Sequence, residues 1–303
     1  MVLAMFAGQG ALPALVIGAL PADQPKPLIA AMGEFPPEGI SVDFTFRLET
    51  LGSLIDTLKA RSVDQMCIVG SISRPSIDPA LIDAATQPLV PELMGALQAG
   101  DDGAIGVIIS LFEREGINIV GAVDLAPDLL VPVGPLFGAA PSPQQARDIE
   151  RASQIVAAMG AADVGQACVV AFGQALAIEA LPGTAWMLNS LTVPKPDADS
   201  SPSEVIGEFI GAATDWLTGE QDTSAPARMR DPALPPGGIL YKAAKPGQEM
   251  RVDMPSIGPD TIAQAVTAGL DGIAIKHGEV LVLDRAAVVA ACKEHNLPLW
   301  VVD

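Results

Sequence analysis

The stretch VLAMFAGQGALPALVIGAL, residues 2–20, sets the expected fold class. A short apolar run ends at Gly8-Gln9-Gly10, and helical spacing resumes over residues 11–20. A strand, a glycine turn and a helix in this order predict the first unit of a parallel α/β sheet. Backbone amides at such a helix start can face an anion, so Gly8 and Gly10 are candidates for substrate contact.

The same turn allows a weak alternative, a nucleotide-binding oxidoreductase. A G-x-G-x-x-G fingerprint would need glycine where Pro13 stands, and no acidic residue follows about 20 positions later at a second strand end. That alternative predicts saturable NAD(P) binding. A tight strand-to-helix turn without a ligand is the simpler interpretation.

The next segments repeat the alternation of strand and helix. Two β-α steps in succession predict parallel pairing and a Rossmann-like N-terminal domain over residues 1–130. The expected strands are residues 42–46, 65–69 and 117–122, and the expected helices are residues 51–60, 88–99 and 103–113.

Three charged residues of this half are candidate ligands. Arg74 follows a strand end, where open parallel sheets place their ligands, although a lone arginine is more often a surface ion-pair partner. Asp101 and Asp102 precede a helix, which is N-cap chemistry by default. They are also hard oxygen ligands of the type that magnesium prefers, so both interpretations stay open.

Residues 131–143 are rich in proline and glycine and predict a linker to a C-terminal mixed α/β domain, residues 144–303. The stretch at about 193–236 is rich in proline, serine, aspartate and alanine, and it is expected to be a solvent-exposed loop with one amphipathic helix at 204–217. The other expected elements are a helix at 144–159, a hairpin of 163–171 with 174–181 around Phe172-Gly173, a strand at 239–241, a helix at 261–268, a hairpin of 272–276 with 280–283 around His277-Gly278, a helix at 285–294 and a strand at 299–302.

Composition narrows the class of partner. A formal net charge of -19 argues against nucleic acid and against electrostatic attachment to an anionic bilayer. The apolar N-terminus lacks basic residues and is broken by glycine and proline, so we expect neither a signal peptide nor a transmembrane segment. The cysteines Cys67, Cys168 and Cys292 stand singly in apolar surroundings and predict small core residues of a reduced compartment.

The reactive side chains gather late in the chain, in GGILYKAAKPGQEMRVDMPSIG, residues 237–258. An apolar strand enters the segment, and Lys245-Pro246-Gly247 forces a turn. Two lysines and one arginine against one glutamate and one aspartate form a local positive island in an acidic chain. That balance suits a phosphate with a metal, although charged loops are more often simply solvated.

The order K-x-x-K-P-G-Q-[DE]-x-R-x-D-x-P-x-I-G-P over Lys242–Pro259 resembles the signature of the LpxI family, the UDP-2,3-diacylglucosamine pyrophosphatases of lipid A assembly. The likeness extends along nearly the whole chain, through the G-x-G-x-L-P opening and the segments V-G-Q-A-C-V-V and A-L-A-I-E-A. Relative to the family, the stretch at about 193–236 looks like an insertion. The resemblance implies Mg2+-dependent cleavage of UDP-2,3-diacylglucosamine to lipid X and UMP in the cytoplasm.

The resemblance also implies roles for single residues. Asp253 is the expected essential carboxylate and metal ligand, and Lys242, Lys245 and Arg251 are expected to contact phosphates. Further metal candidates are Glu249, Asp101 and Asp102, and further substrate-binding candidates are Gly8, Gly10, Arg74, Gln166, Thr184, Gly247 and Gln248. For Gln166 and for Glu179, both within apolar strands, structural hydrogen bonding is the simpler interpretation.

The substrate that the resemblance implies is lipid-linked, so an apolar groove is expected to hold it. The resemblance is also compatible with peripheral contact at the inner membrane and with a homodimer. Two departures from the family pattern favour a second hypothesis. Val123 stands where relatives usually have histidine, and Ala185 stands where they have aspartate. A degenerate relative that binds a nucleotide-sugar lipid without cleaving it is therefore the alternative.

Overall fold

The computed structural model describes residues 2–72, 77–98, 101–195 and 227–303. The chain forms two units that are not continuous in sequence. The first unit comprises Met1–Val131, Gly247–Ser256 and Leu281–Asp284, and the second comprises Pro132–Pro246, Ile257–Val280 and Arg285–Asp303. Two short segments from late in the chain thus complete the first unit.

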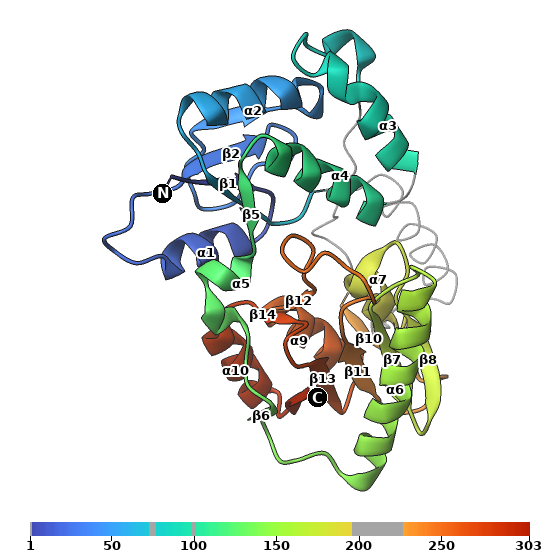
Figure 1. The fold of residues 1–303 in the computed structure, drawn as a ribbon. Helices are drawn as coiled ribbons and strands as arrows, with labels where there is room; N and C mark the ends of the chain where they lie inside the picture. Colours follow the sequence, from blue (N-terminus) through green and yellow to red (C-terminus); the bar gives the residue numbers. More distant parts are fainter. Residues whose placement is uncertain (1, 73–76, 99–100, 196–226) are drawn as a thin grey trace. The chain divides into compact units, whose positions relative to one another are not determined.

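The first unit is built on a five-stranded sheet in the order β3-β2-β1-β4-β5, and all its pairings are parallel (Figure 1). The strands are β1 Leu3–Ala7, β2 Leu28–Met32, β3 Phe44–Phe46, β4 Gln65–Val69 and β5 Asn118–Val120. The helices are α1 Leu12–Ala19, α2 Leu51–Ala60, α3 Val90–Gln98, α4 Asp101–Arg114 and α5 Ala122–Leu125, with short 3-10 turns at Leu48–Thr50, Pro79–Leu81, Gln87–Leu89 and Pro127–Leu129.

Helices cover both faces of this sheet, as a parallel sheet requires. Because side chains alternate along a strand, Ala4 and Phe6 of β1 pack with α2, α3 and α4, whereas Leu3, Met5 and Ala7 pack with α1 and α5. The two apolar clusters fix the sheet from both sides.

The second unit is built on a six-stranded mixed sheet in the order β6-β15-β13-β11-β7-β8. The strands are β6 Gly134–Phe137, β7 Ala167–Ala171, β8 Gln174–Ile178, β11 Ile239–Lys242, β13 Gly272–Lys276 and β15 Leu299–Val302. The central strands β11, β13 and β15 are parallel, and β6, β7 and β8 pair antiparallel at the two edges. The α/β class with a parallel N-terminal sheet and a mixed C-terminal sheet is therefore confirmed.

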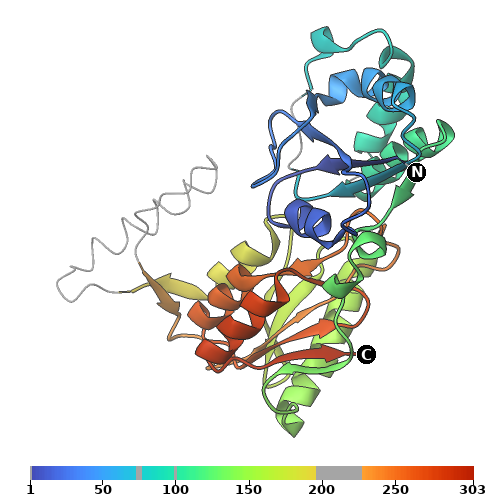
Figure 2. The ribbon, with the colours of Figure 1, turned by 90° about the vertical axis from the view of Figure 1, so that its left-hand side faces the viewer.

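Helices also sandwich the second sheet. Helix α6 (Pro143–Ala161) packs on one face, and Figure 2 shows α9 (Pro259–Thr267) and α10 (Arg285–Glu294) together on the opposite face. Helix α7 spans Gly183–Asn189. Two further pairs of short strands occur, β9 (Thr192–Pro194) with β10 (Arg228–Arg230), and β12 (Ser256–Ile257) with β14 (Leu281–Val282).

Turn chemistry explains the hairpin that the sequence predicts at residues 172–173. Phe172 and Gly173 both have positive φ, 52° and 77°, the backbone of a type I′ turn, so β7 and β8 pair antiparallel. The hairpin predicted around His277-Gly278 is wrong. Strand β13 already has β11 and β15 as its two neighbours, so β14 pairs with β12 instead.

Several boundaries differ from the expected ones. Strand β3 is shorter than residues 42–46, and β5 covers only the middle of residues 117–122. Strand β6 lies within residues 131–143 and forms an edge of the second sheet. The helix expected at 204–217 and most of the expected insertion lie outside the described residues.

Burial settles the role of the cysteines. Cys67, Cys168 and Cys292 are free and buried, and burial raises the pKa of the first two thiols to about 12 and that of Cys292 to about 11. The prediction that they are core residues is confirmed, and the reduced compartment stays a prediction. In the described part of the chain, no helix has the length and apolar character needed to cross a bilayer.

The end of α6 makes a close approach that leads to a testable result. A Cβ on Gly160 would lie 2.6 Å from Cδ of Pro246 and 3.2 Å from Cα of Lys245. Alanine normally gains up to about 1 kcal/mol over glycine within a helix. Here overpacking of about 1–3 kcal/mol opposes that gain, so Gly160→Ala should lower the melting temperature and displace the turn.

The matched control is Gly106→Ala in α4, where an added Cβ meets nothing within 4 Å. That variant should be neutral or stabilised in the same thermal melt. An equal gain in stability from both substitutions would contradict the proposed close packing at Gly160.

Candidate active site

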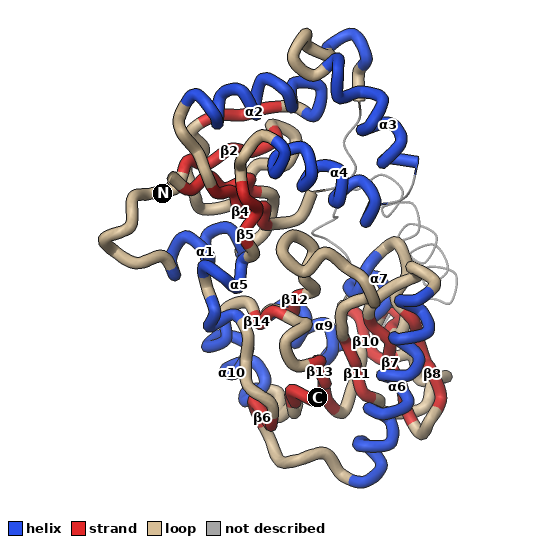
Figure 3. Tube along the Cα trace, viewed as in Figure 1, coloured by secondary structure: helices blue, strands red, loops and turns tan. Residues whose placement is uncertain are grey.

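The segment that carries most of the candidate residues passes from one unit to the other. Strand β11 ends at Lys242, β12 begins at Ser256, and the residues between them form a loop (Figure 3). Residues up to Pro246 belong to the second unit, and residues from Gly247 belong to the first. Gly247 has φ +81°, which explains a glycine at this crossing.

In the second unit, Lys242 is the first residue of a buried polar chain. It lies at the carboxyl end of β11 and is only 7% exposed. Its Nζ donates to Oγ1 of Thr184 at 2.9 Å, and this hydroxyl donates to Oε1 of Glu179 at 3.1 Å. The ammonium is therefore held by a hydroxyl that is itself held by a buried carboxylate.

The second lysine of the segment has a carboxylate partner. Nζ of Lys245 donates to Oδ1 of Asp163 at 2.7 Å. The backbone N–H of Ala244 donates to Oε2 of Glu279, and that of Ala243 donates to the carbonyl of Gln166. These bonds tie the first half of the loop to the body of the second unit.

In the first unit, Asp253 is oriented by a neighbouring amide. Nε2 of Gln248 donates to Oδ2 of Asp253 at 2.7 Å and to its backbone carbonyl at 2.5 Å. The N–H of Asp253 donates to the carbonyl of Glu249 at 2.8 Å, which closes a turn. Gln248 is buried and Asp253 is half-buried, so the carboxylate is both positioned and partly open to solvent.

Arg251 is clamped by two glutamates. Its Nε and Nη2 donate to the two carboxylate oxygens of Glu249 at 2.9 and 2.8 Å, and its Nη1 donates to Oε1 of Glu113 at 2.7 Å. The hydrogen bonds from Arg251 lower the pKa of Glu249, and those carboxylates raise the pKa of the guanidinium. The expected positive island is therefore not bare, because carboxylates surround its arginine and its second lysine.

This clamp predicts a pH dependence of stability. Because the folded pKa of Glu249 is lowered from 4.5, its stabilisation is complete above that value and is lost as the pH falls through the folded pKa. We expect Glu249→Gln to reduce the unfolding free energy by about 1 kcal/mol at neutral pH. In thermal melts, the difference between the parent and the variant should shrink as the pH falls below 4.5 and vanish once it has passed the folded pKa of Glu249. A difference that persists in acid would contradict this assignment.

The Asp253 loop crosses the carboxyl edge of the parallel sheet. Val252 packs against the apolar cluster on one face, and Met254 packs against the cluster on the other. Asp253 is thereby held at the edge between them. A Cβ on Gly121, at the end of β5, would lie 3.4 Å from Cα of Arg251, so the loop lies close to this edge. Parallel sheets bind ligands at this edge.

Local geometry accounts for the glycines at the end of β1. A Cβ on Gly8 would lie 2.5 Å from the carbonyl oxygen of Ser71, and Gly10 has φ +88°. Both positions therefore need glycine whether or not a ligand binds. They lie at the same carboxyl edge as Gly121, two strands away, or about 10 Å. Substrate contact at Gly8 and Gly10 stays a prediction.

Three further predicted site residues are Arg74, Asp101 and Asp102. Arg74 lies outside the described residues. Asp101 and Asp102 lie in the first turn of α4, not before it. Among the described residues, no group of three or more histidine, cysteine, aspartate or glutamate side chains could hold a metal.

The two departures from the family pattern have different surroundings. Val123 lies in α5 and packs against the apolar cluster of the first unit, so an apolar residue suits this position. Ala185 is exposed on α7, directly after Thr184. Sequence reasoning treated Glu179 as structural, and the signal that it passed over was a carboxylate at a strand end five residues before Thr184.

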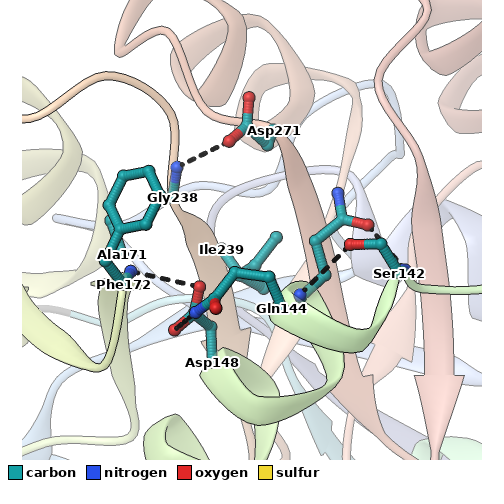
Figure 4. A pocket seen from close by; sticks show the side chains of 9 residues that line it. Ser142, Gln144, Asp148, Ala171, Phe172, Gly238, Ile239 and Asp271 are labelled. Atoms are coloured by element: carbon teal, nitrogen blue, oxygen red, sulfur yellow. Dashed lines mark hydrogen bonds between the residues drawn. The ribbon is translucent and has the colours of Figure 1, made fainter.

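The second unit also holds a cavity of about 250 Å³ beside the start of α6. Figure 4 shows Asp148 at its wall. The residue is 5% exposed, and both oxygens of its carboxylate accept hydrogen bonds. Oδ1 accepts from the N–H of Gly173 at 2.7 Å and from Nε2 of Gln144, and Oδ2 accepts from the N–H of Phe172. This carboxylate therefore stabilises the β7–β8 turn.

Comparison with known proteins covers both units. Residues 2–129 match the model of the LpxI N-terminal domain, and residues 132–200 and 223–300 match that of the LpxI C-terminal domain. The UDP-2,3-diacylglucosamine pyrophosphatase LpxI of Caulobacter vibrioides is 33% identical over 252 residues, which are 83% of this chain and 79% of that protein.

Proposed function

Since the chain belongs to the LpxI family, we propose that it hydrolyses UDP-2,3-diacylglucosamine to lipid X and UMP in lipid A biosynthesis. The single observation that carries this proposal is the segment from Lys242 to Asp253. It presents a buried lysine and a paired lysine on the second unit, and a clamped arginine and an oriented aspartate on the first.

In this proposal, the cations stabilise the negative charge of the diphosphate. Hydrolysis of a diphosphate is largely a matter of positioning and electrostatic stabilisation. Lys242, Lys245 and Arg251 are held in place before substrate arrives, by Thr184, Asp163 and Glu113 among others. Charged donors that are already ordered lose less entropy on binding, which favours the transition state.

In this proposal, Asp253 acts on the water that attacks the diphosphate. We assign it as the group that orients the attacking water and accepts its proton while the water oxygen bonds to one phosphorus of the diphosphate. The bridging oxygen then leaves with the other phosphate. Gln248 fixes Oδ2 of the carboxylate, so its orientation does not depend on the substrate.

Magnesium fits this donor set if the substrate completes the site. Mg2+ is usually bound by one or two carboxylates together with substrate phosphates, and it would neutralise developing charge on the phosphate oxygens. Asp253 is half-buried and suits this role. Glu249 suits it less, because both its oxygens accept from Arg251. Asp101 and Asp102 remain candidate ligands.

We further propose that the chain works in the cytoplasm and meets its lipid-linked substrate at the inner membrane. Leu181 is 92% exposed and Trp186 is 44% exposed, and they flank Thr184. Apolar side chains next to a proposed diphosphate site offer contact area for acyl chains.

The test is hydrolysis of radiolabelled UDP-2,3-diacylglucosamine by the purified chain with Mg2+, with separation of lipid X and UMP. We expect EDTA to reduce the rate at least tenfold and added Mg2+ to restore it. A chain that binds the substrate but releases no UMP under any metal condition would instead support the degenerate relative. An unchanged rate in EDTA would remove the metal from the proposal.

A further inference from the structure

Glu179 lies in one row with Lys242 across the second sheet. Lys242 pairs with Ala167 on β7, and the N–H of Glu179 donates to the carbonyl of Ala167 at 2.8 Å. Residues opposite one another on adjacent strands share a face and lie about 4.8 Å apart, so the two backbones are about 10 Å apart. Ala167 between them has only a methyl group, which leaves room for the two longer side chains.

The hydroxyl of Thr184 fills the remaining gap. An ammonium can only donate, so Oγ1 of Thr184 accepts from Lys242 and its single proton goes to Glu179. The direction of both hydrogen bonds is therefore fixed, from a buried cation through the hydroxyl to a buried carboxylate. Lys242 is 7% exposed and Glu179 is 5% exposed, so neither charge is compensated mainly by water.

The second oxygen of this carboxylate distinguishes it from a structural one. Oε2 of Glu179 is buried and has no hydrogen-bond partner among the described residues. Asp148, equally buried, uses both of its oxygens to hold backbone N–H groups of a turn. A carboxylate left half-satisfied contributes little to the fold for its cost in desolvation. Among the residues that the structure describes, its other oxygen accepts from the hydroxyl that holds Lys242.

We propose that Glu179 is a positioning residue that acts through Thr184 to hold the ammonium of Lys242 in the orientation in which it meets the diphosphate. This inference rests on the proposed function. It adds a residue that does not touch the substrate itself, and it assigns to the hydroxyl of Thr184 the task of connecting the two charges.

The experiment compares kcat/KM of the full chain and of four variants. Glu179→Gln keeps the shape but removes the charge, and Thr184→Val keeps the shape but removes the hydroxyl. Each should lower kcat/KM by about tenfold, as expected for loss of one hydrogen bond to a charged group. Thr184→Ser keeps the hydroxyl and should stay within about threefold of the parent. Asp148→Asn lies in α6 at the turn of the β7–β8 hairpin, and about six strand residues, or about 20 Å, separate that turn from Glu179. This variant should have a lower melting temperature but the same kcat/KM as the parent.

A double-mutant cycle separates positioning from a merely structural role. In the Lys242→Met background, Glu179→Gln should have no further effect on kcat/KM, because the residue that it positions is gone. Losses that multiply, or an unchanged kcat/KM in both Glu179→Gln and Thr184→Val, would overturn the proposal.

Binding of UDP provides a readout that needs no turnover. Calorimetry should give the same pattern of weakened binding for Lys242→Met, Glu179→Gln and the double variant if Glu179 positions Lys242. If the parent chain shows no hydrolysis but this non-additive pattern holds, the hydrolase proposal fails and the positioning role stands. Additive losses in UDP binding would reject the positioning role on their own.

Discussion

Asp253→Asn should lower kcat by about a thousandfold while changing KM by less than about threefold, since a positioned general base contributes roughly 10² to 10⁴ in rate. Asparagine keeps the shape and an oxygen that can accept the hydrogen bond from Gln248, so the turn should persist. Only the capacity to take a proton and to bind a cation is removed. Steady-state kinetics on the radiolabelled substrate measure this result directly.

A control for this variant lies in the same turn. Gln248→Leu removes the amide that orients Asp253 but keeps the carboxylate, and we expect a smaller loss, about tenfold in kcat. Equal losses in the two variants would mean that Asp253 acts through the loop structure. Wild-type turnover in Asp253→Asn would remove the residue from the chemistry.

Lys242→Met should lower kcat/KM by at least a hundredfold and also destabilise the second unit. The methionine fills the space of the lysine stem but leaves the carboxylate of Glu179 buried without its cation. Removing one partner of a buried charge pair costs on the order of 3 kcal/mol. Kinetics and a thermal melt of the same preparation measure both effects.

The two effects can be separated with a second substitution. Lys242→Met with Glu179→Gln removes both charges, so the melting temperature should return toward that of the parent while activity stays low. Lys293→Met, on α10, makes the same change of net charge away from this chain of contacts and should leave both measurements unchanged. Recovery of activity in the double variant would contradict a role for Lys242 at the phosphate.

Much of the fold follows from local signals. Residues 51–60 and 65–69 become α2 and β4 within those limits, because apolar spacing and strand length agree there. The turn at Phe172-Gly173 is visible in the sequence because a positive φ in a two-residue loop favours glycine. Strand β2 was not predicted, because its sequence LIAAM has few β-branched residues. Its burial comes from neighbouring strands, which the local sequence does not reveal.

The wrongly predicted hairpin around His277-Gly278 shows that strand pairing cannot be predicted from local sequence alone. Two apolar runs around His277-Gly278 suggest antiparallel pairing, but strand partners depend on the whole sheet. Parallel neighbours on both sides of β13 leave no free edge for β14. Nothing within residues 272–283 reveals that β11 and β15 occupy those edges.

The candidate site shows the same division. The spacing of residues 242–259 predicts a candidate loop and its cations, because the segment is continuous in sequence. Their partners could not be read from it, since Glu113, Asp163 and Glu179 are brought to the loop by tertiary structure. A loop that looks like a bare cluster of positive charge in sequence is therefore a set of paired charges in the folded chain.

The interleaving of the two units has a consequence for synthesis on the ribosome. Gly247–Ser256 and Leu281–Asp284 belong to the first unit, although more than a hundred residues of the second unit are translated before them. The N-terminal sheet can therefore pair its strands early, but we expect it to acquire its last pieces only when the nascent polypeptide is almost finished. Severing the gene near codon 131 would separate that sheet from the aspartate at its edge, so coexpressed halves would have to reassemble before either carried a complete complement of residues.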